Sequence, residues 1–123
     1  MRSTRVFIIE DDLTMVGLLQ TLLNLEGFST DAYQSSKDHH IHDQIRNTQP
    51  DVIFLDVNLR DMDGLELVQE IKLDPTLQAI PVIMTSGTDY KDLCLKLGAH
   101  NFILKPYMPD DLITMLKKIE IKE

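Results

Sequence analysis

The chain has 123 residues, of which 43% are hydrophobic and 26% are charged, and its formal net charge is −8. This composition predicts a globular domain and excludes an intrinsically disordered chain. The acidic balance argues against direct binding to nucleic acid or to an anionic membrane surface, because both need a basic protein surface. A single cysteine excludes a disulfide within the chain, and no apolar run has the length of a signal peptide core or a membrane span. We therefore expect one cytoplasmic domain over residues 1–123.

The first part of the chain predicts two strands and two helices in alternation. Val6–Ile9 is a short apolar run typical of a strand, and the apolar residues of Leu13–Glu26 recur at helical spacing. Phe28–Tyr33 alternates weakly and predicts a second strand. Within Gln34–Gln49 only a thin apolar stripe is present, which predicts a short exposed helix.

The rest of the chain continues this alternation. The predicted elements are a buried strand at Val52–Leu55, a helix at Gly64–Leu73, a strand at Pro81–Met84, a short helix around residues 93–97 that Gly98 ends, a strand at Phe102–Leu104 and a helix at Asp110–Glu123. Strands that alternate with helices favour a parallel sheet with helices on both faces. The predicted fold class is α/β, a doubly wound (βα)5 arrangement around a five-stranded parallel sheet, without a second domain.

Polar residues follow four of the predicted strands. They are Glu10 and Asp11 after the first strand, Asp56 at the end of the third, Ser86 after the fourth and Lys105 after the fifth. The carboxyl ends of parallel strands lie at one edge of the sheet, where ligands bind in open α/β folds. Three carboxylates, a hydroxyl and an ammonium are thus expected to converge there.

This set of groups predicts phosphoryl transfer assisted by a metal ion. Three close carboxylates repel one another, and a divalent cation relieves the repulsion. Oxygen ligands without histidine or cysteine suit Mg²⁺ or Mn²⁺. Lys105 and the Ser86 hydroxyl could then hold a phosphoryl group, and Asp56 is the carboxylate left to act as nucleophile. The expected reaction is phosphorylation of Asp56 followed by hydrolysis of the acyl phosphate.

The same residues form a set of motifs that resembles the receiver domain of two-component response regulators. The motifs are Ile9-Glu10-Asp11-Asp12, Leu55-Asp56 with Met62-Asp63-Gly64, Thr85-Ser86-Gly87 and Lys105-Pro106-Tyr107. The resemblance covers essentially the whole chain. It implies the flavodoxin-like strand order 2-1-3-4-5 and a phosphoacceptor function that uses Mg²⁺ or Mn²⁺.

The resemblance also implies a role for each matching residue. Asp56 matches the phosphoacceptor, Asp11 the direct metal ligand and Glu10 a neighbour that acts through water. The main-chain carbonyl of Asn58 matches a further metal ligand. Ser86 matches the switch hydroxyl, Lys105 the lysine that pairs with phosphate, and Phe102 the aromatic residue that rotates inward on activation. The Lys105-Pro106 peptide bond is expected to be cis.

The implied partners follow from the family. A sensor histidine kinase or a phosphotransfer protein would phosphorylate Asp56, and an unidentified downstream protein would read the switched surface. The protein would be a monomer or a weak phosphorylation-dependent dimer, with no direct contact to nucleic acid or membrane and no turnover of an external substrate. Asn58 and Thr88 match positions that tune dephosphorylation.

Two features depart from the family pattern. Arg60 stands where the loop after Asp56 often has proline, so this loop is expected either to be looser or to make a new ion pair. The spacing between Ser86 and Lys105 is about three residues shorter than is usual for receivers. This shortens either the fourth helix or the loop before it, and helix four and strand five form the usual partner-binding face.

Alternative roles stay open for some of these residues. Glu10 and Asp11 could cap the helix that begins at residue 13, Thr85 could replace Ser86, and Phe102 could be an ordinary core residue. For the whole chain the alternatives are a phosphorylation-independent interaction module of the same fold, a flavin-binding electron carrier and an aspartyl phosphatase. The first lacks support because Asp56, the acidic pair and Lys105 are all present. The flavin carrier would need a Ser, Thr or Gly-rich phosphate loop where Glu10 to Asp12 stand.

Overall fold

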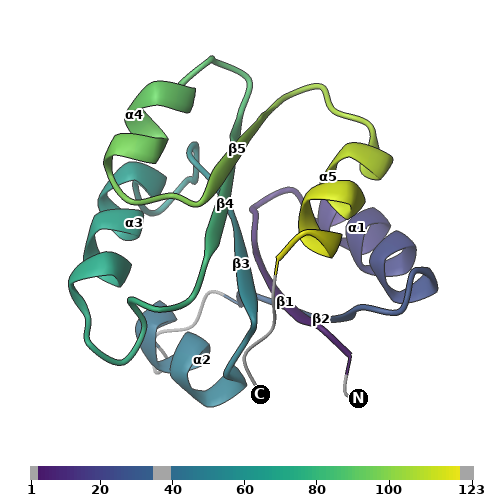
Figure 1. The fold of residues 1–123 in the computed structure, drawn as a ribbon, viewed down its shortest axis with the longest axis horizontal. Helices are drawn as coiled ribbons and strands as arrows, with labels where there is room; N and C mark the ends of the chain where they lie inside the picture. The colour runs from purple at the N-terminus through teal and green to yellow at the C-terminus, as the bar shows by residue number, and fades with distance from the viewer. Residues whose placement is uncertain (1–2, 35–39, 120–123) are drawn as a thin grey trace.

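The computed structural model describes residues 3–34 and 40–119, and strands and helices alternate along the chain (Figure 1). The strands are β1 Arg5–Ile9, β2 Ser29–Ala32, β3 Val52–Asp56, β4 Val82–Ser86 and β5 Asn101–Leu104. The helices are α1 Leu13–Leu25, α2 Ile41–Thr48, α3 Gly64–Leu73, α4 Lys91–Lys96 and α5 Pro109–Lys117. All ten predicted elements are present. The last predicted helix was too long, because α5 ends at Lys117; residues 35–39 and 120–123, which two predicted helices included, lie outside the described residues.

The five strands form one parallel sheet in the order β2-β1-β3-β4-β5, which confirms the predicted fold. Helices α1 and α5 cover one face, and α2, α3 and α4 cover the other (Figure 1). The strand order reverses direction between β1 and β3, so their carboxyl ends lie at the topological switch point, where such sheets bind ligands. None of the helices in the described residues is long and apolar enough to cross a membrane.

Each face of the sheet has its own hydrophobic cluster, because successive side chains of a strand point to opposite faces. Val6, Ile8, Val52 and Phe54 pack with residues of α1 and α5, such as Leu19 and Leu112. Phe7, Ile9, Ile53 and Leu55 pack with residues of α2, α3 and α4, such as Ile45, Ile71 and Cys94. The central strands are apolar on both faces and are therefore anchored firmly. The buried central strands therefore also fix the positions of the residues that follow their carboxyl ends.

Two helices differ from a simple reading of the sequence. Helix α2 was predicted to be exposed, but Ile41 and Ile45 are buried in the core and only its polar side faces solvent. Helix α4 has six residues, so it is a short helix that follows a short loop. Gly98 follows its end with φ +113, a conformation that favours glycine, as predicted for a helix terminator.

Candidate functional site

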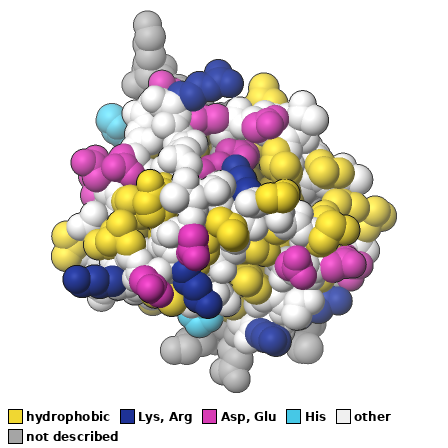
Figure 2. Space-filling model, turned by 90° about the horizontal axis from the view of Figure 1, so that it is seen from above, with side chains coloured by type: hydrophobic (Ala, Val, Ile, Leu, Met, Phe, Trp, Pro, Cys, Tyr) yellow, Lys and Arg dark blue, Asp and Glu magenta, His cyan; other side chains and the backbone are white. Residues whose placement is uncertain are grey.

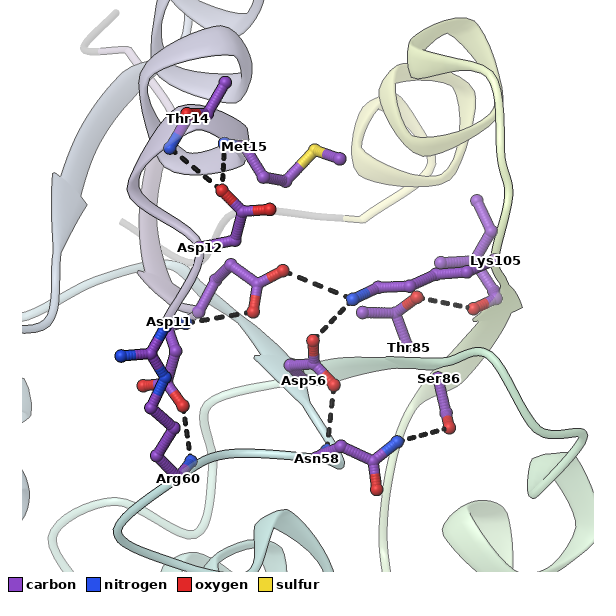
Figure 3. Close-up of polar contacts among 12 residues, drawn as sticks. Asp11, Asp12, Thr14, Met15, Asp56, Asn58, Arg60, Thr85, Ser86 and Lys105 are labelled. Atoms are coloured by element: carbon purple, nitrogen blue, oxygen red, sulfur yellow. Dashed lines mark hydrogen bonds and ion pairs between the residues drawn. The ribbon is translucent and has the colours of Figure 1, made fainter.

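Strand alternation brings an acid, a second acid and a lysine together at the carboxyl edge of the sheet. Glu10 continues the Val6 and Ile8 side of β1, and Asp56 ends β3 on the same side. Lys105 follows β5 and reaches across β4 toward both (Figure 3). The carboxyl ends of β1, β3 and β5 thus bring these three residues together.

Lys105 is shared by the two carboxylates. Its Nζ lies 2.5 Å from Asp56 Oδ2 and 3.2 Å from Glu10 Oε1, and the two acidic side chains are only 4% and 9% exposed. Burial alone lowers the pKa of Lys105, but the adjacent Asp56 and Glu10 together outweigh it and raise the pKa. Burial raises the pKa of Glu10, and the nearby Asp56 carboxylate raises it further against the opposite effect of Lys105. One ammonium therefore serves two acids that repel each other.

The remaining acids of the first motif have separate contacts. Asp12 caps α1, because its carboxylate accepts hydrogen bonds from the main-chain N–H groups of Thr14 and Met15 at 3.0 and 3.2 Å. Helix capping therefore does not account for Glu10 or Asp11. Asp11 accepts a hydrogen bond from the main-chain N–H of Arg60 (Figure 3). Arg60 was expected to loosen its loop or to make an ion pair. It makes no ion pair among the described residues, and its amide instead fastens the loop to Asp11.

The two hydroxyls at the carboxyl end of β4 have different partners. Thr85 donates to the main-chain carbonyl of Ile103 at 2.8 Å within the sheet and is buried there. Ser86 Oγ accepts hydrogen bonds from Asn58 Nδ2 and from the Thr88 main-chain N–H, both at 3.1 Å. Asn58 also donates its main-chain N–H to Asp56 Oδ1 at 2.8 Å. Ser86 is therefore the hydroxyl linked to the Asp56 neighbourhood, and Thr85 is committed to holding β5.

Gly64 holds the loop after β3 against the strand that precedes it. Its main-chain N–H donates to the Val57 carbonyl at 3.0 Å. A Cβ atom at this position would lie 2.4 Å from the main-chain oxygen of Asp56 and 2.7 Å from Val57 Cα. Only glycine fits this close backbone approach. The sequence showed Gly64 within a motif, but this steric role was not predicted.

The acidic edge opens to solvent. An opening of about 660 Å³ is lined by Glu10, Asp11, Asp12, Leu13, Thr14, Asp56, Asn58, Arg60 and Lys105. Figure 2 looks down on this side of the molecule from above the view of Figure 1, and acidic and basic side chains lie next to each other near its centre. Asp56 itself is 3% exposed, so the opening reaches a carboxylate that is otherwise enclosed.

The donor atoms at this opening fit Mg²⁺ or Mn²⁺. Asp11 and Asp56 supply carboxylate oxygens and Asn58 can supply a main-chain carbonyl, which are the hard oxygen ligands these ions prefer. Within residues 3–34 and 40–119 no three His, Cys, Asp or Glu side chains converge as a complete ligand set. Lys105 already contacts two of the acids, and Mg²⁺ needs only one or two carboxylates beside its waters.

Two aromatic residues lie near the site. Phe102 is 5% exposed and belongs to the core cluster beneath α3 and α4, so its ring points inward. The Lys105-Pro106 bond is cis, as expected, and Tyr107 follows it. The Tyr107 hydroxyl is buried and has no hydrogen-bond partner among the described residues, and its ring packs edge-on against Phe54. Burial and the negative charges of Glu10 and Asp56 raise the pKa of Tyr107. The sequence analysis placed Tyr107 in a motif but assigned it no role.

Comparison with known proteins agrees with this arrangement. The model of the response regulator receiver domain matches residues 6–117. The chain is 32% identical over 121 residues to the transcriptional regulatory protein KdpE of Staphylococcus aureus, covering 96% of this chain and 50% of that protein. It is 28% identical over 116 residues to the DNA-binding response regulator MtrA of Mycobacterium tuberculosis, covering 92% of this chain and 49% of MtrA. The chain thus spans about half the length of these curated relatives.

Solved structures show the same fold. A putative response regulator from Chloroflexus aurantiacus superposes with a TM-score of 0.84 at 26% identity, covering 96% of this chain and 98% of that chain. The receiver domain of the sensor histidine kinase PA1611 from Pseudomonas aeruginosa, solved with a magnesium ion coordinated in its active site cleft, superposes with a TM-score of 0.81. That pair is 18% identical and covers 95% of this chain and 97% of the other, so it shows likeness of fold.

Proposed function

Because the chain belongs to the response regulator receiver domain family, we propose that it receives a phosphoryl group on Asp56 and converts it into a change of protein surface. The observation that carries this proposal is the enclosed Asp56 carboxylate at the base of the acidic opening, with the Lys105 ammonium 2.5 Å away. An acid placed this way is accessible from one direction only. A cation stands beside it to pair with the charge that phosphorylation adds.

The proposed reaction is a direct displacement at phosphorus. An Asp56 oxygen forms a bond to phosphorus as the P–N bond of a phosphohistidine breaks, and the imidazole leaves with the bonding electrons and takes up a proton. Water later attacks the acyl phosphate, releasing inorganic phosphate and restoring the carboxylate. A sensor histidine kinase or a phosphotransfer protein is the proposed donor.

Asp11, Asp56 and the Asn58 carbonyl would hold a Mg²⁺ ion, with Glu10 acting through a bound water. When bound, the ion offsets the negative charge of the carboxylates and of the transferred group. Lys105 contributes a positive charge 2.5 Å from Asp56, because it begins the segment after β5. This residue assignment is supported by the donor set and by the strand ends that supply it.

Ser86 is the proposed link from the phosphoryl group to the surface. Its oxygen now accepts two hydrogen bonds, so its own proton remains available to a phosphoryl oxygen. Donation of that proton would draw the Ser86–Thr88 segment toward Asp56 and alter the start of α4. Phe102, beneath α4, would repack in response. The output would be a switched surface of α4, β5 and α5 that an unidentified protein recognises.

The proposal also covers the oligomeric state and contact with nucleic acid. MtrA, which is named as a DNA-binding response regulator, is about twice the length of this chain, so the predicted lack of nucleic-acid contact concerns residues 1–123 alone. We propose a monomer, or a weak dimer that forms on phosphorylation, that turns over no external substrate.

A small phosphodonor tests the proposal directly. The protein is incubated with acetyl phosphate and Mg²⁺, and intact mass is measured at mildly acidic pH, where acyl phosphates persist. We expect a gain of one phosphoryl group that Asp56→Asn abolishes and that the matched exposed variant Asp31→Asn retains. No gain in the parent, or an equal gain in Asp56→Asn, contradicts the assignment.

Variants of Ser86 and Thr85 separate the phosphorylation of Asp56 from the structural change at α4. Ser86→Ala is expected to keep the mass gain but to lose the spectral changes of the α4 segment in amide NMR. Thr85→Val is expected to lower stability by about 1–2 kcal/mol, because the buried Ile103 carbonyl loses its donor, while the α4 response persists. The same response in Ser86→Ala and the parent would contradict the proposed role of Ser86.

A further inference from the structure

The loop after β3 is fastened to Asp11 by a main-chain donor. The amide of Arg60 donates to Asp11 Oδ2, and the two residues are 49 positions apart in the sequence. No lysine or arginine forms an ion pair with Asp11 in the described part of the chain. A proline at position 60 would have no N–H to donate. The contact therefore depends on a residue other than proline at this position.

This contact restricts the carboxylate that the proposed function assigns to the metal. One oxygen of Asp11 accepts the hydrogen bond from the Arg60 amide, and Asp11 lines the same opening as Asp56. Hydrogen bonds to the outer side of a metal ligand fix its orientation, and losing one typically weakens metal binding by about 10–100-fold. The amide thus favours cation binding.

The side chain of Arg60 has the opposite electrostatic effect. The residue is exposed and lines the same opening, and its guanidinium makes no hydrogen bond or ion pair within residues 3–34 and 40–119. Figure 3 shows the side chain extending from its loop toward Asp11. A positive charge at the rim of this opening repels a divalent cation, and salt screens the repulsion.

We propose that Arg60 is a positioning residue for the cation site that acts through two parts in opposite directions. Its amide orients Asp11 and strengthens divalent-cation binding, and its guanidinium weakens that binding. This inference rests on the proposed function, because it assigns Asp11 to a Mg²⁺ ion.

Calorimetric titration with Mg²⁺, repeated with Mn²⁺, separates the two parts. Arg60→Ala keeps the amide and removes the charge, so we expect about twofold tighter binding at low salt and no difference at high salt. Arg60→Lys keeps both parts and should bind like the parent. Arg60→Pro removes both, and we expect it to bind about tenfold or more weakly than Arg60→Ala. Lys96→Ala is the control for net charge, because it removes an exposed charge at the carboxyl end of α4.

A second measurement covers the case in which Arg60→Pro fails to fold. In the parent, the Arg60 amide should give a downfield NMR resonance that moves upfield in Asp11→Ala and shifts on addition of Mg²⁺. If the Arg60 amide resonance shifts neither in Asp11→Ala nor on addition of Mg²⁺, the inference is overturned. Equal Mg²⁺ affinity of Arg60→Ala and a folded Arg60→Pro also overturns it. A parent that binds neither Mg²⁺ nor Mn²⁺ overturns the proposed function itself, which is a distinguishable result.

Discussion

The two ends of the sheet use the same kinds of charged side chain in different ways. At the amino end, the Arg46 guanidinium contacts Asp43, Asp74 and the Thr76 hydroxyl, which ties α2 to the loop after α3. At the carboxyl end, Lys105 is divided between Asp56 and Glu10, and further acids surround the same opening. At each end one cation contacts two acids, but the acids at the carboxyl end are more deeply buried: the side chains of Asp56 and Glu10 are 4% and 9% exposed, against 60% and 16% for Asp43 and Asp74.

We expect this difference in burial to separate charges that stabilise the fold from charges that take part in the proposed function. All three nitrogens of the Arg46 guanidinium make these contacts, which lie at the surface, so they contribute modestly to stability. The acids beside Asp56 remain in mutual repulsion that an added cation would relieve. Changes at the amino end should therefore alter stability alone, and changes at the carboxyl end should alter ligand response.

The largest effect is expected at Gly64, where the carboxyl end depends on contact between main chains. Gly64→Ala places a methyl group 2.4 Å from the Asp56 main-chain oxygen, so we expect a loss of about 3 kcal/mol in unfolding free energy. Phosphorylation of Asp56 should fall as well. Gly17→Ala in α1 is the matched control, because its Cβ meets nothing within 4 Å; it should stabilise by about 0.5–1 kcal/mol. Denaturant unfolding of both variants gives the comparison, and equal stability would contradict the steric role of Gly64.

The next effect is stabilisation by magnesium. If only the folded carboxyl end binds the ion, unfolding free energy should rise by about 1.4 kcal/mol at a Mg²⁺ concentration ten times Kd. Asp11→Asn should lose this gain, and Asp43→Asn at the amino end should retain it. Thermal or denaturant unfolding with and without Mg²⁺ measures the difference. A magnesium gain that persists in Asp11→Asn would remove Asp11 from the site.

A smaller effect is expected for Arg46→Ala. The variant loses its contacts to Asp43, Asp74 and Thr76, and we expect about 1 kcal/mol lower stability, since each exposed ion pair contributes little. The yield of phosphorylated Asp56 and the Mg²⁺ affinity should stay at the parent values. Altered phosphorylation in this variant would break the separation between the two ends.

The smallest effect is a difference in pH dependence, and its sign differs between the ends. The pKa of Glu10 is raised above 4.5, so its charging disfavours folding as pH rises from that value, and Glu10→Gln should gain stability relative to the parent over this range. The pKa of Asp74 is lowered below 3.8, chiefly by hydrogen bonds from Thr76 and then by Arg46. Its stabilisation is present above 3.8 and is lost as pH falls through the lowered pKa, so Asp74→Asn should differ least from the parent in acid. Unfolding free energy is measured against pH without Mg²⁺ for the parent and both variants. The same pH dependence of the stability difference from the parent in Glu10→Gln and Asp74→Asn would contradict the opposite directions of the two pKa shifts.

The sequence predicted the parts of this molecule that follow from local patterns. Apolar runs located the strands, and the rule that parallel strands share an edge brought Glu10, Asp56 and Lys105 together. The end of the last helix was less well predicted, because α5 ends at Lys117. The burial of α2 was also missed, because the burial of Ile45 depends on packing against the sheet.

Contacts made by main-chain atoms could not be predicted in the same way. The Arg60 amide bonded to Asp11 and the Gly64 approach to Asp56 depend on how one loop folds back on another strand. The spacing of apolar residues does not predict how a loop folds back. The sequence also could not show which hydroxyl contacts Asn58, because Thr85 and Ser86 are adjacent and chemically alike. Only the pleat of β4 directs their side chains to opposite faces.

The shared position of Lys105 has a consequence for how the site fills. The Lys105 side chain is an internal counter-ion for Asp56 and Glu10, so a dication binding at the proposed site would meet carboxylates that are already paired with an ammonium. Magnesium occupancy of the proposed site would then depend on competition with Lys105 for the two carboxylates. The position of one lysine side chain would thereby set how strongly the protein responds to the magnesium concentration around it.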